Sequence, residues 1–311
     1  MTMLMTMERK EWQRRLGEIV HGRIAFDEPL AAYTTLRVGG PADAIVFPES
    51  IEEIRGVVRM TRAQSLPLLV LGGGSDVVVR DGGFRGVVLR MGRNFAGSRV
   101  IAGDRIEARA GESFPSLLRT ARTGSLAGLE FLATVPGCVG GGVATNVGAY
   151  GQWFADVLVS YTLLDRDARE TNVPRDQMEF GYRYARLPEG SVITGAVFQL
   201  TMKPRDEIEE TVRNYAQSRR DSQPLRASSA GCIFKNPDNA KQAGYLIDKA
   251  GLKGMAVGGA AISEQHGNFL INRGGATAND VLTLLAEVRK IVKKRYDVEL
   301  EPEVRILGED E

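Results

Sequence analysis

Residues 132–151, LATVPGCVGGGVATNVGAYG, form the stretch that most restricts what this chain can fold into. They contain six glycines and one proline but no charged side chain. Glycine reaches positive φ freely and lets other groups approach closely, so we expect this backbone to turn repeatedly while staying buried. An anionic ligand here would have to be held by successive backbone N–H groups. The alternative is a tight glycine turn packed in a core.

A second glycine loop lies upstream, at residues 71–76 (LGGGSD). It follows an apolar run at residues 66–70 that is typical of a buried strand. Two such loops in one chain indicate a single long ligand that carries phosphate.

Length and charge limit the function classes. The chain has 311 residues, of which 43% are hydrophobic and 25% charged, so it is typical of a globular protein with about two domains. Its 40 basic and 39 acidic residues leave a net charge of +1. Such a balance gives no general attraction to nucleic acid or to an anionic membrane, so we expect neither as a partner.

The sequence also favours a cytoplasmic location. No apolar run approaches the roughly 18 residues that a membrane span needs, and residues 1–8 contain no hydrophobic core of a signal peptide. The two cysteines, Cys138 and Cys232, are not spaced as metal ligands, and only His21 and His266 could join them. We therefore expect no metal site, and no structural disulfide in a reducing compartment.

Apolar periodicity predicts an α+β organisation. Predicted helices cover residues 8–20, 51–62, 114–123, 205–220 and 242–250, and a long helix opens with the capping pair Thr277 and Asp280. That helix should bury one apolar stripe, made up of Val281, Leu284, Leu285, Val288, Ile291 and Val292. Predicted strands cover residues 44–47, 67–71, 77–80, 86–91, 100–102, 105–110, 157–165, 191–202, 268–272 and 298–306. The charged helix at 205–220 marks a boundary, because the sequence texture changes after it.

Three side chains stand out as candidates for chemistry. Arg183 lies between two tyrosines and could clamp a carboxylate through two hydrogen bonds, or it could be a surface arginine stacked on a tyrosine. Cys232 lies in a small-residue turn and could be a reactive thiol or a small buried side chain. Glu303 alternates with apolar residues in the last predicted strand, where it could equally be an ordinary solvated carboxylate.

Taken together, seven blocks resemble one family in order and over nearly the whole chain. The blocks are residues 33–42, 71–79, 135–151, 181–183, 229–237, 262–272 and 300–305. They resemble the UDP-N-acetylenolpyruvoylglucosamine reductase family of bacterial peptidoglycan synthesis. Arg183 and Cys232 lie 232 − 183 = 49 positions apart, which leaves little room for the tyrosine-bearing insertion of one branch, so the chain resembles the shorter, second type.

The resemblance implies an α+β fold with two parts. An FAD-binding module of the vanillyl-alcohol-oxidase (PCMH) type, in two subdomains at about 1–92 and 93–204, would be followed by a C-terminal α+β substrate domain at 205–311. It also implies non-covalent FAD, NADPH as co-substrate, and an enolpyruvyl sugar nucleotide as substrate. We expect a monomer.

The resemblance also assigns binding residues. Those expected to contact FAD are Tyr33, Arg37, Gly72, Gly73, Gly74, Ser75, Asp76, Pro136, Gly137, Gly140, Gly141, Asn146, Gly148 and Ala149. Those expected to contact the substrate are Tyr150, Tyr182, Arg220, Gln223 and Asn236.

The catalytic assignments follow from the same resemblance. Flavin N5 would deliver hydride to C3 of the enolpyruvyl group, and Arg183 and Glu303 would stabilise the resulting enolate. The proton for C2 would come from the position of Cys232, where the family pattern has serine. Asp76 and Thr145 also depart from the pattern, in which asparagine and a larger apolar residue are usual. Because an aspartate pointing at a pyrophosphate would repel it, we expect the Asp76 carboxylate to face backbone N–H groups or a ribose hydroxyl.

Two other functions stay open at this point. A flavin oxidase of the same superfamily would need a covalent attachment residue near the glycine loops, and Cys138 is the candidate. A non-catalytic nucleotide-binding protein would not need Arg183, Cys232 and Glu303 together, so their joint presence argues against it.

Overall fold

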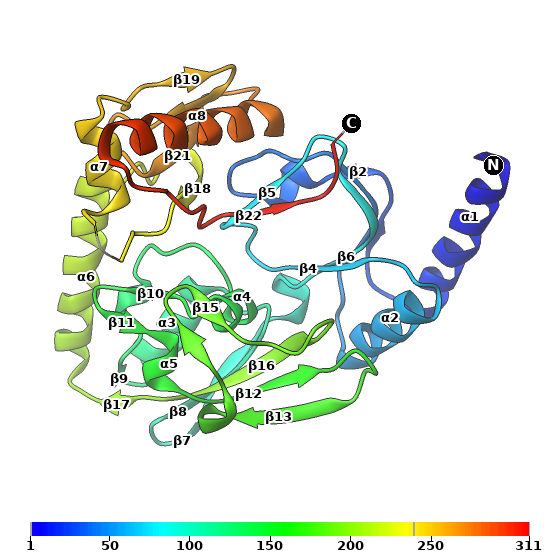
Figure 1. Ribbon diagram of the computed structural model, residues 1–311. Coiled ribbons are helices and arrows are strands. Elements are labelled where there is room, and N and C mark those ends of the chain that lie inside the picture. The colour runs from blue at the N-terminus through cyan, green and yellow to red at the C-terminus, as the bar shows by residue number, and fades with distance from the viewer. Residues whose placement is uncertain (1, 239, 311) are drawn as a thin grey trace. The chain divides into compact units, whose positions relative to one another are not determined.

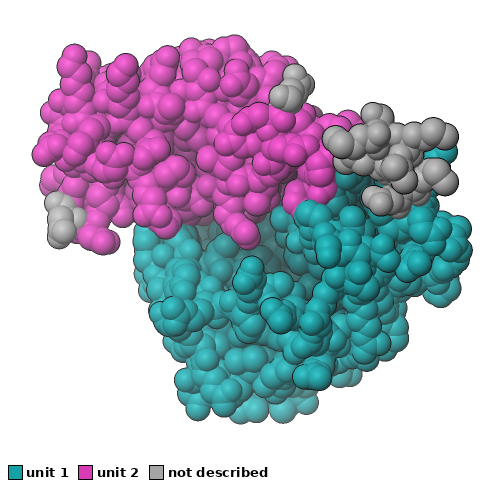
Figure 2. All heavy atoms as spheres, turned by 45° about the vertical axis from the view of Figure 1, so that its right-hand side comes forward, with its two compact units in different colours: residues 1–27, 43–73, 86–215 teal, residues 28–42, 74–85, 216–311 magenta. Residues whose placement is uncertain are grey.

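A computed structural model describes residues 2–238 and 240–310, and these residues form two compact units. Unit 1 comprises residues 1–27, 43–73 and 86–215, and unit 2 comprises residues 28–42, 74–85 and 216–311 (Figure 2). The sequence predicted a cofactor module up to residue 204 and a substrate domain from residue 205, and this assignment of ligands to domains stays a prediction. The compact units are divided differently, because unit 2 contains two N-terminal segments, 28–42 and 74–85, besides the C-terminal residues.

The first sheet has the strand order β1-β3-β6-β4, with β2 paired to β3. Its strands are β1 (Ile24–Ala25), β2 (Glu28–Pro29), β3 (Pro41–Val46), β4 (Leu68–Leu71) and β6 (Phe84–Arg90). Helix α2 (Ile51–Ala63) joins β3 to β4, as the sequence predicts, and β4 runs parallel to β6. Strand β4 ends at Leu71, so it delivers the chain directly into the first glycine loop.

Unit 1 also contains a five-stranded antiparallel sheet with the order β13-β12-β16-β8-β7 (Figure 1). Its strands are β7 (Ser98–Ala102), β8 (Arg105–Arg109), β12 (Leu158–Leu164), β13 (Glu170–Pro174) and β16 (Val192–Gln199). The short helix α4 (Val139–Ala144) contacts β8 and β16. The second glycine loop is therefore supported by this sheet.

Shorter elements and three longer helices complete unit 1. They are α1 (Thr2–Ile19), η2 (Arg93–Phe95), α3 (Phe114–Thr123), β9 (Leu126–Ala127), η3 (Glu130–Leu132), β10 (Gly148–Ala149), β11 (Gln152–Trp153), α5 (Phe154–Val157), η4 (Arg175–Gln177), β14 (Phe180–Gly181), β15 (Tyr184–Ala185), β17 (Thr201–Met202) and α6 (Arg205–Ser222). Helix α6 begins in unit 1 and continues into unit 2 after residue 215.

Unit 2 is built on a four-stranded antiparallel sheet with the order β18-β21-β20-β19. Its elements are η1 (Leu30–Tyr33), β5 (Val77–Val79), β18 (Ser228–Cys232), α7 (Ala243–Lys249), β19 (Ala256–Val257), β20 (Ala260–Ile262), β21 (Phe269–Asn272), α8 (Ala278–Tyr296) and β22 (Arg305–Leu307). The predicted capping pair opens α8, since Asp280 N donates to Thr277 Oγ1 and Thr277 N donates to Asp280 Oδ2 (both 3.0 Å).

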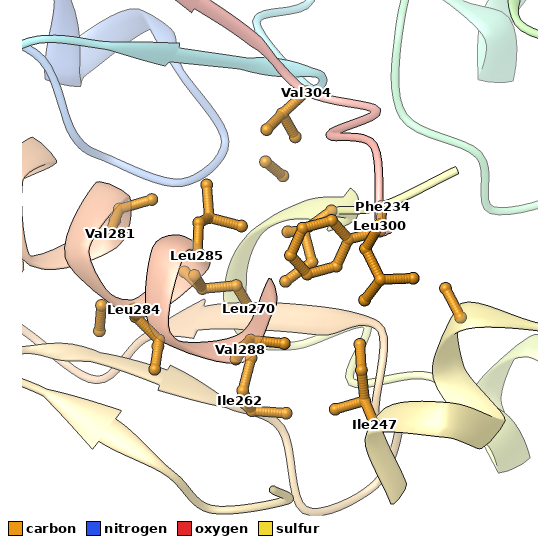
Figure 3. Close-up of a cluster of buried hydrophobic side chains, with 14 of the residues drawn as sticks. Phe234, Ile247, Ile262, Leu270, Val281, Leu284, Leu285, Val288, Leu300 and Val304 are labelled. Atoms are coloured by element: carbon orange, nitrogen blue, oxygen red, sulfur yellow. The ribbon is translucent and has the colours of Figure 1, made fainter. Parts of the chain in front are cut away.

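The core of unit 2 gathers apolar side chains from α7, α8 and the sheet (Figure 3). The predicted stripe of α8 is confirmed, because Val281, Leu284, Leu285, Val288 and Val292 are buried and Ile291 packs against them partly buried. Phe234 and Leu300 are fully buried in the same core. The residues beside Phe234 and Leu300 are thus anchored by this core.

The strand predicted at residues 298–306 is wrong for most of its length. Only Arg305–Leu307 forms a strand, β22, and it pairs in parallel with β5. Residues 300–303 instead follow Phe234, which bridges to Pro302. The pairing is an isolated bridge, flanked by hydrogen bonds from the N–H of Lys235 to the carbonyl of Glu301 (2.9 Å) and from the N–H of Glu303 to the carbonyl of Ile233 (2.8 Å), so Pro302 needs no N–H there.

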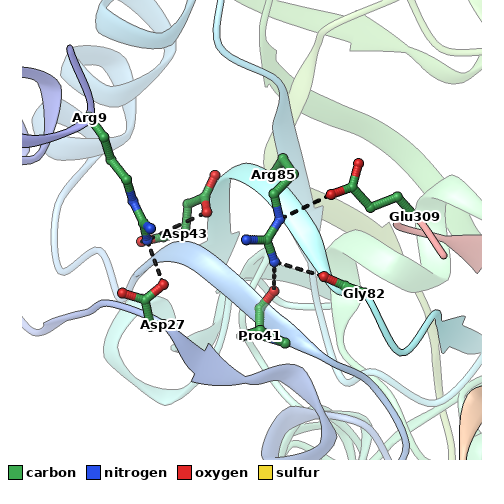
Figure 4. Close-up of polar contacts among 7 residues, drawn as sticks. All are labelled: Arg9, Asp27, Pro41, Asp43, Gly82, Arg85 and Glu309. Atoms are coloured by element: carbon green, nitrogen blue, oxygen red, sulfur yellow. Dashed lines mark hydrogen bonds and ion pairs between the residues drawn. The ribbon is translucent and has the colours of Figure 1, made fainter. Parts of the chain in front are cut away.

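In each unit an arginine side chain joins loop residues through ion pairs and hydrogen bonds (Figure 4). In unit 1, Arg9 pairs with Asp27 (2.5 Å) and Asp43 (3.4 Å). In unit 2, Arg85 donates to the carbonyls of Pro41 (2.9 Å) and Gly82 (2.8 Å) and pairs with Glu309 (3.3 Å). No helix within residues 2–238 and 240–310 is long and apolar enough to cross a bilayer.

Candidate active site

The two predicted glycine loops touch each other in unit 1. A Cβ added at Gly73 would lie 2.8 Å from the Cα of Gly137, and one added at Gly72 would lie 2.5 Å from the Sγ of Cys138. Real Cβ atoms do not approach neighbours so closely, so both positions require glycine. The sequence predicted that the two loops serve one ligand, and the structure brings this pair of segments together.

Several glycines of the second loop are needed for packing. A Cβ at Gly137 would meet the ring of Phe114 at 2.5 Å, and one at Gly142 would meet Phe154 at 2.5 Å. The N–H of Gly140 donates to the carbonyl of Ala110 (2.8 Å). The packed-turn alternative therefore accounts for part of the glycine pattern.

Other positions in the same loop fit a bound ligand. Gly141 is exposed, and a Cβ there would meet only the Sγ of Cys138 at 3.9 Å, so packing against the protein does not require glycine at this position. Residue 136 is exposed too. A loop surface without charged side chains lets a ligand approach the backbone closely. This agrees with the expectation that backbone N–H groups, not charged side chains, bind FAD here.

In unit 2, the remaining predicted FAD segments lie against one another. A Cβ at Gly74 would be 2.1 Å from the carbonyl oxygen of Tyr33, and the N–H of Thr35 donates to the carbonyl of Gly74 (2.9 Å). Thr35 Oγ1 donates to the carbonyl of Ser229 (2.6 Å). The segment with Tyr33 is thus tied both to the first glycine loop and to the strand that carries Cys232.

Cys232 and Glu303 are brought together by backbone pairing. Cys232 ends β18, which is irregular because Gly231 takes a φ of 77° and its N–H donates to Ser229 Oγ (3.0 Å). The N–H of Glu303 donates to the carbonyl of Ile233 (2.8 Å), the residue after Cys232. Both side chains are partly buried. The structure therefore places Glu303 on the segment that pairs with the residue after Cys232, although the two positions are 71 residues apart in sequence (303 − 232).

The backbone after Glu303 is anchored as well. The N–H of Arg305 donates to the carbonyl of Asp76 (2.8 Å). Glu303 is therefore held at its own N–H by Ile233 and two residues later, at Arg305, by Asp76. The predicted roles of Asp76 and Ser75 toward FAD stay predictions.

Arg183 occupies the turn of a hairpin in unit 1. The turn joins β14 to β15, and Arg183 has a φ of 56°, in the left-handed region. Its Nη1 donates to the carbonyl of Gly148 (2.9 Å), and its guanidinium lies 5.5 Å from the ring centroid of Trp153 and 5.6 Å from that of Tyr182. The arginine is thus placed by a hydrogen bond and by two aromatic faces.

The predicted substrate residues fall into two groups. In unit 1, Tyr150 is exposed, stacks on Tyr215 with ring centroids 3.9 Å apart, and donates from its hydroxyl to the Tyr215 carbonyl (3.0 Å). In unit 2, exposed Asn236 accepts from the N–H of Ala243 (3.1 Å) at the start of α7. These contacts fix both side chains in the absence of any ligand.

Tyr182 lies beside Arg183, as described above, and the last two predicted substrate residues lie in the last turn of α6 and directly after it. Arg220 is exposed and donates to Gln217 Oε1 (2.8 Å). The Oε1 atom of Gln223 is buried and has no hydrogen-bond partner within the described part of the chain. A buried acceptor of this kind is available to a donor on a ligand.

Sequence reasoning missed residues that support the site. Buried Asn268 accepts from the N–H of Phe234 (3.1 Å) and donates to its carbonyl (2.8 Å), so it fixes the segment after Cys232. Trp153 and Tyr215 hold Arg183 and Tyr150 through their rings. The only sequence signal for Tyr215 was a lone aromatic residue on a charged helix.

The free energy of unfolding should depend on pH through His266. This histidine accepts a hydrogen bond from Asn268, which in turn holds Phe234 in the segment after Cys232. The Nδ1 of His266 accepts from the N–H of Asn268 (3.1 Å), and burial, together with the charge of Lys253, lowers the pKa of His266 below its usual value of 6.5. The unfolded chain then binds more protons than the folded one, so the free energy of unfolding should fall as pH drops through about 6.5. Denaturant titrations of wild type and His266→Gln should show a smaller fall in the variant. The matched control His21→Gln should keep the wild-type fall, and equal pH dependence in all three proteins would contradict the assignment.

Comparison with known proteins agrees with this arrangement. The FAD binding domain family matches residues 42–173, and the C-terminal domain of UDP-N-acetylenolpyruvoylglucosamine reductase matches residues 223–307. The expected α+β class, with an FAD-binding module followed by a C-terminal domain of this family, is confirmed.

Relatives cover nearly the whole chain. The UDP-N-acetylenolpyruvoylglucosamine reductase of Geotalea uraniireducens is 41% identical over 296 residues, which span 95% of this chain and 98% of the relative. That of Geobacter metallireducens is 42% identical over 300 residues, spanning 96% and 99%. The crystal structure of the Thermus caldophilus enzyme is 36% identical, with a TM-score of 0.78 over 91% of this chain and 98% of that one. The chain therefore belongs to the UDP-N-acetylenolpyruvoylglucosamine reductase family, whose members are FAD-dependent reductases.

Proposed function

We propose that this chain reduces UDP-N-acetylenolpyruvoylglucosamine to UDP-N-acetylmuramate with NADPH, as a step in peptidoglycan precursor synthesis. The observation that carries the proposal is the backbone pairing of Glu303 with Ile233, which brings the segment of Glu303 next to the residue after Cys232. Family membership supports the same substrate. FAD, bound without a covalent link, would supply the chemistry by taking hydride from NADPH and passing it from N5 to C3 of the enolpyruvyl group.

The two glycine loops are the part of the chain that we propose to hold FAD. Gly72, Gly73 and Gly141 offer backbone without side chains, and Gly74 lies against Tyr33 in unit 2. Hydrogen bonds from backbone N–H groups can hold a pyrophosphate without lysines. The other residues proposed for FAD contact, Arg37 and Ala149 among them, come from the segments that resemble the family.

Arg183 and Glu303 are proposed to stabilise charge on the substrate. Addition of hydride at C3 leaves negative charge that spreads from C2 onto the carboxylate. A guanidinium held by Gly148 and Trp153 can meet a carboxylate with two parallel hydrogen bonds. Glu303 can help only as a hydrogen-bond donor, which requires its protonated form.

Cys232 is proposed to give the proton to C2 and so complete the reduction. Its position at the irregular end of β18 leaves the thiol partly exposed rather than packed in the core. Tyr150, Tyr182, Arg220, Gln223 and Asn236 are proposed to bind the sugar nucleotide. The buried, unpartnered Oε1 of Gln223 gives that residue the most direct support.

We further propose that the enzyme acts as a cytoplasmic monomer. A net charge of +1 gives it no general affinity for nucleic acid or anionic lipid. Its partners would then be small molecules only.

Product analysis tests the proposed reaction. Purified protein incubated with NADPH and UDP-N-acetylenolpyruvoylglucosamine should yield a product heavier by two hydrogen atoms, in equal amount to the NADPH consumed. Protein without NADPH should leave the substrate unchanged. Consumption of NADPH only by oxygen, with no reduced sugar nucleotide, would contradict the proposal.

Release of the flavin tests the mode of FAD binding. We expect boiling or acid to release free FAD into solution, because the glycine loops offer hydrogen bonds and the nearby Cys138 is buried with its Sγ against Gly72. Absorbance of the supernatant measures the release, and Cys138→Ser should release the same amount. Flavin that stays with the precipitate in wild type but not in Cys138→Ser would favour a covalently linked oxidase.

A further inference from the structure

Arg183 lies in a backbone conformation that arginine does not favour. Its φ of 56° is in the left-handed region, which only glycine and, to a lesser degree, asparagine and aspartate visit readily. The hairpin that carries it is short, since β14 and β15 contribute only two residues each. Something outside the hairpin must therefore hold this turn in place.

The second glycine loop supplies two hydrogen bonds to this hairpin. Arg183 Nη1 donates to the carbonyl of Gly148 (2.9 Å), and Asn146 Nδ2 donates to the carbonyl of Gly181 (3.1 Å). The bonds run in opposite directions, and their partners are two residues apart on each segment. Together they fix both the position and the tilt of the hairpin relative to the loop.

Both polar atoms of the Asn146 side-chain amide form hydrogen bonds within the protein. Asn146 is only 5% exposed, and its Oδ1 accepts from the N–H of Ala155 (3.0 Å). A carbonyl partner requires the NH₂ group and an N–H partner requires the oxygen, so the two contacts also fix the orientation of the amide. Asn146 itself has a φ of 44°, which asparagine tolerates better than most residues.

We propose that Asn146 is a positioning residue that acts through Arg183, rather than a residue that contacts FAD. Its amide bonds the Gly181 carbonyl and so holds the turn from which the Arg183 guanidinium projects over Trp153. The proposal rests on the proposed function, in which Arg183 clamps the substrate carboxylate. It gives Asn146 a role that differs from the FAD contact expected from the sequence.

The substitution Asn146→Asp isolates the bond to Gly181. Aspartate has nearly the same shape, tolerates the left-handed region and can still accept from Ala155, but it faces the Gly181 carbonyl with a second acceptor. We expect the variant holoenzyme to keep its FAD content, its thermal unfolding midpoint within a few degrees, and its rate of flavin reduction by NADPH. Reoxidation by the enolpyruvyl substrate should slow about tenfold, and calorimetry should show correspondingly weaker substrate binding.

A double variant tests whether Asn146 acts through Arg183. Arg183→Lys already lacks the guanidinium that Asn146 is proposed to position. Adding Asn146→Asp to Arg183→Lys should therefore not slow reoxidation of the flavin any further. The matched control is Thr145→Val, since the Thr145 hydroxyl donates within its own segment, to the carbonyl of Gly141 (2.9 Å). Thr145→Val should reoxidise as wild type does. Additive losses, or loss of FAD from Asn146→Asp, would overturn the proposal.

One readout needs neither substrate nor turnover. The sequence has two tryptophans, Trp12 and Trp153, so the Trp153 indole signal in a ¹⁵N–¹H spectrum can be assigned with Trp12→Phe. Asn146→Asp and Arg183→Lys should both shift the Trp153 signal, and Thr145→Val should not. If wild type fails to react with the substrate while this pattern holds, the proposed function is wrong and the positioning role stands. An unmoved Trp153 signal in Asn146→Asp would overturn the positioning role by itself.

Discussion

Changing Cys232 to alanine should leave reduction of the flavin by NADPH intact and slow its reoxidation by substrate by about 10² or more. A positioned proton donor contributes about 10² to 10⁴ in rate, and alanine has no proton to give. The irregular end of β18 is set by Gly231 and Ser229 rather than by the thiol, so the backbone should keep its shape. Stopped-flow absorbance of the flavin measures the two half-reactions separately.

The matched control is Cys232→Ser, which restores the residue of the family pattern. A free cysteine has a pKa of about 8.5, and a thiolate cannot donate a proton, so wild-type reoxidation should fall as pH rises through that region. Serine does not ionise in this range, so Cys232→Ser should stay active and lose this alkaline decline. Near-normal reoxidation in Cys232→Ala would remove the thiol from the mechanism and leave Ser229 as the next donor to test.

Changing Arg183 to lysine should slow reoxidation of the flavin by substrate by about 10² to 10³. Lysine keeps the positive charge but loses the planar pair of donors, and one lost contact to a developing oxyanion costs on the order of 3 kcal/mol. Lysine also forfeits the geometry in which the guanidinium reaches Gly148 and lies over Trp153. Reduction by NADPH should be unchanged.

Arg186→Lys provides the control for this prediction. Arg186 lies just after the same hairpin, is exposed, and pairs with Glu179 (2.9 Å) on the surface. An exposed ion pair contributes little, so this variant should keep both half-reactions. Equal losses in both half-reactions of Arg183→Lys would make Arg183 a general structural residue.

The sequence predicted the elements that depend on local pattern. The stripe and the capping pair of α8 are found as predicted, because helix periodicity and Thr277–Asp280 capping act within one segment. The prediction that the two glycine loops serve one ligand stays a prediction, and the close approach of Gly73 to Gly137 is consistent with it. Glycine patterns report close approach, so they carry information about contacts far apart in the chain.

Other features could not be read from local pattern. Residues 298–304 alternate like a strand, yet their pairing with Phe234 is an isolated bridge at Pro302, and Leu300 is buried in the core of unit 2. The grouping of residues 28–42 and 74–85 with the C-terminal part depends on tertiary contacts such as Thr35 to Ser229. The resemblance assigned Asn146 to FAD, while its hydrogen-bond partners, Ala155 and Gly181, are distant in sequence and could not be read from local pattern.

Anaerobic titration of the flavin absorbance tests the central claim most directly. Purified protein should be yellow, NADPH should bleach it in the absence of oxygen, and UDP-N-acetylenolpyruvoylglucosamine should restore the colour in equal molar amount. In Cys232→Ala, bleaching should be as fast as in wild type and recovery about 10² slower or more. Protein that bleaches but does not recover its colour on adding the enolpyruvyl substrate would contradict the account.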